Sequence, residues 1–168
     1  MDAVRQLENT PEILRLLLDG LTEEDAGWKP APDRFSIAEV IEHLSHVEGH
    51  CYRARLDATL EVDGAAWEAY EIEAYKAAGQ FSGRSAEDSF DHWEEQRESN
   101  LELLNGLEEG WEKRCGMHPR FGRVTLGELV NEWAYHDLGH VRQIAELVRA
   151  RKYHPEMGPY RPHYKVKP

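Results

Sequence analysis

Residues 131–147, which read NEWAYHDLGHVRQIAEL, combine the hydrophobic spacing of a helix with two histidines four positions apart. When residues 126–150 are wound at about 100° per residue, apolar side chains gather in one stripe along the helix. The stripe consists of Leu126, Val130, Trp133, Leu138, Val141, Ile144 and Val148. His140 falls at the margin of this stripe, and His136 lies a little further round on the same side. The stretch therefore predicts a long amphipathic helix that carries two neighbouring imidazoles.

Capping signals predict where the helices begin. A capping box, in which a hydroxyl and a carboxylate satisfy free backbone amides at a helix start, opens two long helices. The two boxes are formed by Ser36 with Glu39 and by Thr125 with Glu128. Ser85 is the expected N-cap of a third helix, and Thr10 before Pro11 is the expected N-cap of a short one. The predicted helices cover about residues 11–20, 37–60, 86–108 and 126–151, followed by a C-terminal tail over 152–168.

These four helices predict an all-α fold, and in a chain of 168 residues we expect them to form one domain over residues 1–168. The sequence has no alternating strand pattern and no internal repeat. A four-helix bundle is the expected architecture, because each helix has one apolar side to bury. The long connection over residues 61–84 can hold a short helix of its own and is long enough to return along the bundle. We therefore expect a crossover between the second and third helices.

Composition limits the partners that the chain can bind. The formal charge of −12 and the pI near 5.2 disfavour nucleic acid and anionic membranes. The two cysteines, Cys51 and Cys115, are far apart in the sequence and form no CxxC motif, which is typical of a reducing compartment. Residues 1–14 show no basic region followed by an apolar one, and no run approaches about 18 apolar residues, so we expect neither a secretory leader nor a membrane span. We therefore expect a soluble, cytoplasmic protein with no nucleic-acid or membrane partner.

The spacing of His136 and His140 lets both imidazoles reach one cation, because residues four apart are neighbours on a helix. Such a pair also arises by chance at the edge of a core, so alone it is a weak signal. The second predicted helix adds His43, His46 and His50. In the helical projection His43 flanks the apolar stripe, His50 lies farther out and His46 points toward water. His43 is therefore the best third ligand, and antiparallel packing of the two helices brings it level with His140.

Asp137 and His118 are the other two candidate site residues. Asp137 falls inside the apolar stripe, where a carboxylate has to be paired or hydrogen-bonded. One hypothesis makes it the acceptor that orients a ligand imidazole, and another makes it a structural partner of a helix terminus or a tryptophan N–H. His118 lies in the loop MHPRFG, which could cover a metal ion. It is either a pocket residue that transfers a proton or a loop histidine packed beside Pro119.

Two stretches, RFSIAEVIEHLSHVE (34–48) and HPRFGRVTLGELVNEWAYHDLGHVRQI (118–144), resemble the DinB-like (DinB/YfiT) superfamily of bacterial four-helix bundles. The resemblance touches all four helices and is specific in these two places, with Phe35 where many relatives have tryptophan. It implies a bundle with a long crossover and one divalent metal ion held by His43, His136 and His140. It also implies a possible homodimer, and some relatives use low-molecular-weight thiols such as bacillithiol or mycothiol as cosubstrates.

Three histidines around one divalent ion, whether zinc, nickel, iron or manganese, would leave a coordination position open for catalysis. From the resemblance we expect a metal-dependent enzyme that transfers a low-molecular-weight thiol to an electrophilic small-molecule substrate. No glutamate is clearly placed as a general base beside the HxxxH pair, which disfavours hydrolysis. A metal-dependent hydrolase and a non-enzymatic, stress-related metal-binding module are the alternatives, and the sequence does not choose among the three.

Overall fold

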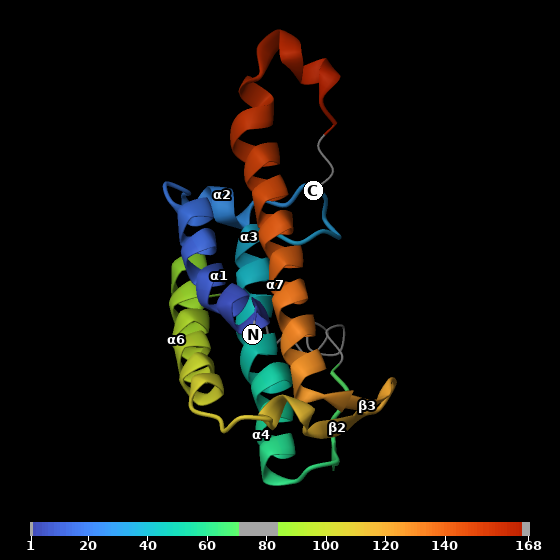
Figure 1. The fold of residues 1–168 in the computed structure, drawn as a ribbon. Helices are drawn as coiled ribbons and strands as arrows, with labels where there is room; N and C mark the ends of the chain where they lie inside the picture. Colours follow the sequence, from blue (N-terminus) through green and yellow to red (C-terminus); the bar gives the residue numbers. More distant parts are fainter. Residues whose placement is uncertain (1, 71–83, 166–168) are drawn as a thin grey trace.

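The computed structural model describes residues 2–70 and 84–165. Four long helical segments run side by side, which confirms the predicted all-α four-helix bundle (Figure 1). They are α1 (Asp2–Leu18), the continuous run of α3 (Ile37–Val47), η1 (Glu48–Arg53) and α4 (Ala54–Glu61), α6 (Ala86–Asn105), and α7 (Leu126–Val148). The capping boxes at Ser36 and Thr125 and the N-cap at Ser85 are present as predicted.

The α3 and α6 helices pack against each other and run in the same direction. Gln96 donates a hydrogen bond to Ser45 at 3.1 Å, and further along both segments Arg53 donates to Asn100 at 3.0 Å. Because the two helices are parallel, the chain between α4 and α6 has to return over the length of the bundle. Its course over 71–83, and with it the short helix expected in this connection, lies outside the described residues.

The α7 helix runs antiparallel to the α3–α4 segment. The rings of His43 and His140 lie 4.8 Å apart, whereas further along α3–α4 the ring of Tyr52 stacks on Trp133 at 4.6 Å. Higher residue numbers on one segment therefore meet lower numbers on the other. This is the orientation that we expected to bring His43 level with His140.

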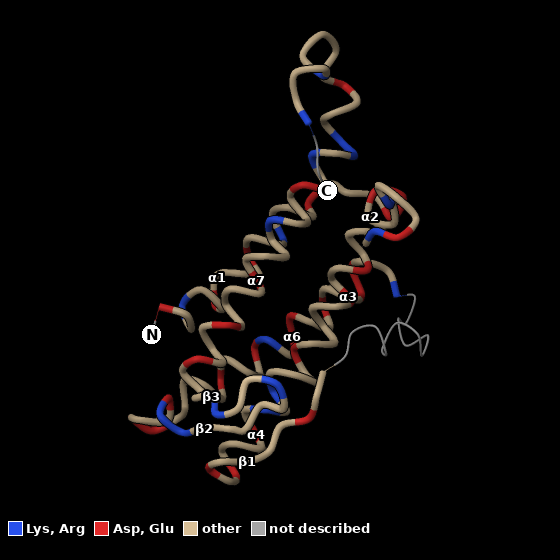
Figure 2. The backbone as a smooth tube through the Cα atoms, turned by 90° about the vertical axis from the view of Figure 1, so that its right-hand side faces the viewer, with Lys and Arg blue, Asp and Glu red and all other residues tan. Residues whose placement is uncertain are grey.

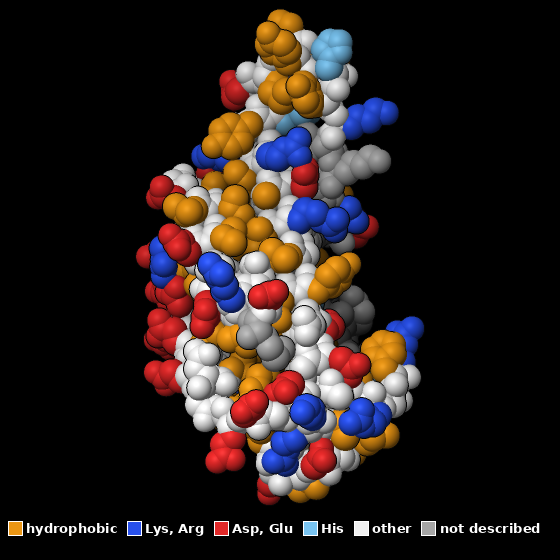
Figure 3. All heavy atoms as spheres, viewed as in Figure 1, with side chains coloured by type: hydrophobic (Ala, Val, Ile, Leu, Met, Phe, Trp, Pro, Cys, Tyr) orange, Lys and Arg blue, Asp and Glu red, His pale blue; other side chains and the backbone are white. Residues whose placement is uncertain are grey.

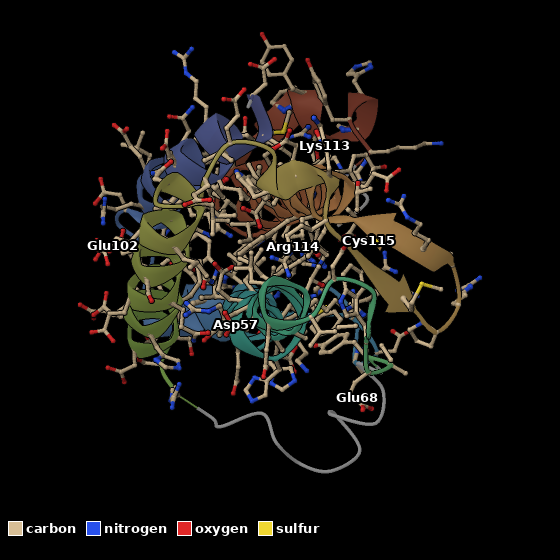
Figure 4. The ribbon with its side chains drawn as sticks, turned by 60° about the horizontal axis from the view of Figure 1, so that its bottom comes forward. Asp57, Glu68, Glu102, Lys113, Arg114 and Cys115 are labelled. Carbon is tan, nitrogen blue, oxygen red and sulfur yellow. The ribbon has the colours of Figure 1, made fainter. Side chains whose placement is uncertain are left out.

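A small sheet at one end of the bundle corrects the expectation of a chain without strands. Its strands, in the order β1-β2-β3, are β1 (Ala65–Ala66), β2 (Cys115–His118) and β3 (Gly122–Thr125). β2 and β3 form an antiparallel hairpin, and β1 joins β2 in parallel. The hairpin stands to one side of the bundle, with Cys115 at its base (Figure 4). The strands are too short for a recognisable alternation of apolar and polar residues. The sequence feature that marks the hairpin is Gly122, whose φ of 73° favours glycine.

The α1 helix begins well before the predicted start at residue 11, so Pro11 lies inside it. The hydroxyl of Thr10 donates to the carbonyl of Gln6 at 2.9 Å, which makes Thr10 an interior residue rather than an N-cap. Because Pro11 has no N–H, it leaves the carbonyl of Leu7 without its helical donor. That carbonyl accepts a hydrogen bond from the guanidinium of Arg97 in α6, at 3.0 Å. The proline thus frees an acceptor that another helix uses.

The centre of the bundle holds a buried ion network around Arg97, whose side chain is 0% exposed. The guanidinium donates to both carboxylate oxygens of Glu48, at 2.7 and 2.9 Å. It also donates to both oxygens of Asp137, at 2.7 and 3.2 Å. Glu48 accepts further hydrogen bonds from Trp93, Trp133 and Asn100. Through the Leu7 carbonyl as well, one guanidinium joins α1, η1, α6 and α7.

The charges of this network persist in the core because they are paired. Burial alone would lower the pKa of Arg97, but its two carboxylate partners outweigh burial and raise that pKa above its usual range, so the guanidinium stays charged. Burial raises the pKa of Asp137, and Arg97 opposes this effect. Apolar side chains cover the network on both sides, in one cluster that contains Trp133 and another that contains Trp93.

Beyond the bundle, α7 continues into a projecting arm (Figures 1 and 2). The arm consists of η3 (Arg149–Tyr153), η4 (His154–Glu156) and η5 (Gly158–His163). Arg151 and Lys152 donate to the carboxylate of Asp25, at 3.0 and 2.8 Å, and this fastens the base of the arm to α2 (Glu23–Gly27). The predicted C-terminal tail is thus partly helical.

The surface of the bundle is acidic along the edge formed by α6, as Figure 3 shows. No helix in the described part of the chain is both long and apolar enough to cross a membrane. On the outer face of α7, Tyr135 is 80% and Leu138 is 45% exposed. Leu138 was expected in the buried stripe, but it lies at the edge of that stripe and faces outward. The homodimer implied by the family resemblance stays a prediction.

Replacing Arg97 with methionine should lower the free energy of unfolding by about 3–5 kcal/mol, because it leaves two buried carboxylates without their cation. Arg15→Met is the matched control, since Arg15 forms an exposed ion pair with Glu94 on the surface of the same bundle and should cost at most about 1 kcal/mol. Urea denaturation of both variants measures the difference. Equal losses in the two proteins would contradict the structural role of the network.

Candidate metal centre

Two antiparallel helices bring three histidines to one point. His43 comes from α3, and His136 and His140 come from successive turns of α7. The Nε2 atoms of His43 and His140 each lie 3.2 Å from the Nε2 atom of His136. One ligand nitrogen from each ring falls within 4.8 Å of the others. The structure therefore brings together the same three histidines that the helical projection selected.

The tautomer of His140 presents a lone pair to this point. Its Nδ1 lies 2.9 Å from the Oε1 atom of Gln143, and an amide oxygen can only accept, so Nδ1 carries the ring proton. The Nε2 atom of the neutral ring is then unprotonated and faces His136. From its spacing of three after His140 on the same helix, Gln143 was expected either to line the mouth of a pocket or to be solvated, and the structure places its amide beside that ring.

Burial keeps the imidazoles of α7 neutral. It lowers the pKa of His136 to about 3, with smaller contributions from the charges of His140 and Arg97. It also lowers the pKa of His140, while the hydrogen bond to Gln143 opposes this effect. Neutral imidazole is the form that binds a metal ion, so these ligands need not lose a proton at neutral pH.

The spacing of the three nitrogens fits a divalent ion better than it fits hydrogen bonding among the rings. Neutral His136 offers one proton or one lone pair at Nε2, so it cannot make two full hydrogen bonds to His43 and His140. Nitrogens bound at 2.0–2.1 Å to a tetrahedral ion lie about 3.3 Å apart, close to the 3.2 Å that separates the Nε2 atom of His136 from those of His43 and His140. Three protein ligands would leave at least one coordination position for solvent or substrate.

A cavity of about 240 Å³ opens beside His136. Its wall includes Tyr52 of η1, Arg55 of α4, Glu132 of α7 and His118 of β2. The π-helical turn η1, which interrupts an otherwise regular helix, turns Tyr52 toward α7, and such turns recur at functional sites. The β2–β3 hairpin, which the sequence did not predict, contributes His118, Phe121 and Val124 to this wall.

Glu132 corrects the expectation that no glutamate is placed beside the histidine pair. It lies one turn before His136, so that Glu132, His136 and His140 follow each other at intervals of four residues on α7. Its carboxylate shares the cavity with His136. Burial raises the pKa of the Tyr52 hydroxyl well above its usual range, and the charge of Glu132 together with a hydrogen bond to it adds to the effect. The signal in the sequence was the repeated spacing of four.

His118 lies in the wall of the same cavity, as the pocket hypothesis expected. Its Nδ1 atom accepts the backbone N–H groups of Arg120 and Phe121, at 3.0 and 3.3 Å. Burial lowers the pKa of His118, and the positive charges of Arg55 and Arg120 lower it further. The ring is therefore neutral and fixed in orientation by the hairpin turn. Its expected role in proton transfer stays a prediction.

Asp137 is buried as predicted, with 1% of its surface exposed. Both of its carboxylate oxygens accept hydrogen bonds from Arg97. Its partner is thus a guanidinium from α6, which neither hypothesis from the sequence had named. Asp137 follows His136 directly in α7, so this ion pair anchors the turn that carries two of the three histidines.

Comparison with known proteins places the chain in a family. The sequence profile of the DinB superfamily matches residues 6–144, which confirms the resemblance seen in the sequence. The fold is similar to that of YfiT from Bacillus subtilis, described as a probable metal-dependent hydrolase with an unusual four-helix bundle topology. The two structures agree with a TM-score of 0.78 at 21% identity, over 89% of this chain and 85% of that one. No curated protein sequence matches the chain significantly.

Changing His43, His136 or His140 to alanine should abolish stoichiometric metal binding, because each removal leaves only two ligands. His92→Ala is the control, since His92 lies exposed on α6. Elemental analysis after equal loading should give about one divalent ion per chain for the wild type and the control. Full occupancy in the His136→Ala protein would show that the triad does not hold the metal.

Asp137→Ala should lower the free energy of unfolding by about 1–3 kcal/mol, because it leaves part of the Arg97 guanidinium without acceptors. Metal occupancy should change little, since Asp137 bonds to Arg97 rather than to an imidazole. Thermal unfolding and elemental analysis of the same samples separate the two effects. Loss of metal at unchanged stability would instead support the hypothesis that Asp137 orients a ligand.

Proposed function

The chain belongs to the DinB superfamily, and we propose that it is a metal-dependent hydrolase whose ion is held by His43, His136 and His140. The observation that supports this proposal is the carboxylate of Glu132, which shares one cavity with the ligand His136. Hydrolysis requires a base near the metal to take a proton from water, and Glu132 is the carboxylate available in that cavity. The description of YfiT as a probable metal-dependent hydrolase agrees with this reading.

The three imidazoles would hold zinc, nickel, iron or manganese. A divalent ion bound there would supply Lewis acidity, which lowers the pKa of water toward ~7 and polarises a carbonyl group. The protein side chains provide the rest of the chemistry. His140, fixed by Gln143, keeps its lone pair directed at the site, and the buried neutral rings preserve this arrangement across the neutral pH range.

Glu132 would accept the proton released from water and return it to the leaving group. The hydroxyl of Tyr52, which stays protonated because burial raises its pKa, lies near the Glu132 carboxylate and would donate to it. The cavity walls contributed by Val47, Leu129 and Val124 are apolar and would limit the access of bulk water. Glu132 thus lines the cavity beside Tyr52 and the proposed ligand His136.

The other two functions expected from the sequence receive less support. Among the described residues, no specific feature points to the transfer of a low-molecular-weight thiol. A purely structural metal site would need a fourth protein ligand, and within the described part of the chain the cluster contains three. A panel of small esters and amides is the appropriate probe of the proposed hydrolysis.

Glu132→Gln should reduce kcat for metal-dependent ester or amide hydrolysis by about 10²–10⁴-fold, because the amide cannot accept a proton. Metal content should stay at the wild-type level, since Glu132 is not a ligand. Glu146→Gln, a change of the same kind on the same helix but outside the cavity, should leave kcat unchanged. The panel is run with and without a low-molecular-weight thiol, and chelation should abolish turnover.

Two outcomes would contradict the proposal. If the Glu132→Gln protein turned over substrate as fast as the wild type, Glu132 would not be the general base. Turnover that appears only when a thiol is added, and that yields a thioether, would instead establish the transferase.

A further inference from the structure

Two hydrogen-bond donors meet on the wall of the cavity that α4 and the β2–β3 hairpin form. They are the Nη2 atom of Arg55 and the Nε2 atom of His118, which lie 3.4 Å apart. Both residues line the cavity that also contains His136 and Glu132. The proposed hydrolytic chemistry uses neither of them, so their presence beside the site needs a separate explanation.

The tautomer of His118 decides what this pair can bind. Because its Nδ1 atom accepts the N–H groups of Arg120 and Phe121, the proton of the neutral ring sits on Nε2. A guanidinium can only donate. Nη2 of Arg55 and Nε2 of His118 are therefore both N–H donors, and they cannot satisfy each other. An acceptor that lies between them would satisfy both.

The position of Arg55 is built into the fold. Its guanidinium carbon lies 5.4 Å from the ring centroid of Trp67, within the range of a cation–π contact. The indole N–H of Trp67 donates to the hydroxyl of Thr59 at 2.9 Å. Gly116 of β2 leaves room for this ring, because a Cβ atom there would lie 2.1 Å from Trp67. The donor pair thus rests on a fixed aromatic support rather than on a flexible surface.

The charge of Arg55 is available to a ligand. In the two ranges that the structure describes, no carboxylate forms an ion pair with it. Glu132 lines the same cavity but interacts with Tyr52, and Asp57 pairs with the neighbouring Arg53. Arg55 is half-buried, where an ionic hydrogen bond is stronger than on an open surface.

We propose that Arg55 and His118 form a subsite for a carboxylate group of the substrate, so that the enzyme acts on small anionic esters or amides. The reaction named here rests on the proposed hydrolytic function, whereas the binding of the carboxylate does not. A guanidinium and a second N–H donor match the planar acceptor geometry of a carboxylate. The cavity volume of about 240 Å³ suits a compact ligand. His118 then has a binding role in place of proton transfer.

Isothermal titration of the metal-loaded protein with glutarate tests the subsite directly. Glutaramide serves as the neutral analogue and inorganic phosphate as the alternative oxyanion. Arg55→Met should weaken glutarate binding by about tenfold or more, because it removes an ionic hydrogen bond. Arg55→Lys keeps a charge on the same helix and should bind more tightly than Arg55→Met. Arg53→Met is the matched control, since Arg53 lies on the adjoining turn but outside this cavity, and it should bind glutarate as the wild type does.

A carboxylate could also bind the metal ion itself, so the same titration is run on His140→Ala, which lacks a ligand. The difference between arginine and methionine at position 55 should persist in that background. The proposal would be overturned if Arg55→Met bound glutarate as tightly as the wild type, or if glutaramide bound as tightly as glutarate. It would also be overturned if arginine and methionine at position 55 gave equal affinity in the His140→Ala background. Tighter binding of phosphate than of glutarate would overturn the choice of carboxylate. Because binding needs no turnover, a failure of hydrolysis leaves this result intact.

Discussion

The buried guanidinium of Arg97 has to find all its acceptors inside the protein, because an unpaired ion in the core costs several kcal/mol. It finds them on three other segments, in Glu48, Asp137 and the Leu7 carbonyl that Pro11 leaves free. These contacts permit little sliding of one helix along another. Since Glu48 follows His43 by five residues and Asp137 follows His136 directly, the same contacts set α3 and α7 in register. The convergence of the three imidazoles is thus a consequence of how the core satisfies one charge.

The sequence was sufficient for features that depend on local periodicity. Helical spacing and capping boxes located the long helices, and the projection of two of them selected the three histidines and the burial of Asp137. The partner of Asp137 could not be found this way, because Arg97 lies on a third helix and reads as one charge in an acidic surface segment. Pro11 was misread as a helix start for a similar reason. Its meaning depends on an acceptor that is used only after the helices pack.

The cavity was even harder to predict from the sequence than the partner of Asp137. Its wall combines η1, α4, α7 and a hairpin of strands too short to recognise, so no single stretch contains it. The spacing of four before His136 could have identified Glu132 as a candidate, but only the structure shows that it lines the cavity. The structure joins a three-histidine cluster, a carboxylate and a donor pair around one small space. The histidines would bind a metal ion, the carboxylate would accept a proton and the donor pair would bind an anionic group. Together they form a candidate site for a polar small molecule beside a metal ion.

The central claim is that three imidazoles hold one divalent ion and leave a position open. X-ray absorption spectroscopy of the metal-loaded protein tests this claim most directly, because it counts and identifies the atoms bound to the ion. We predict three imidazole nitrogens at about 2.0–2.1 Å together with at least one oxygen from solvent. A sulfur at about 2.3 Å, which would place Cys51 or Cys115 in the coordination shell, or a shell filled by four protein nitrogens, would contradict it.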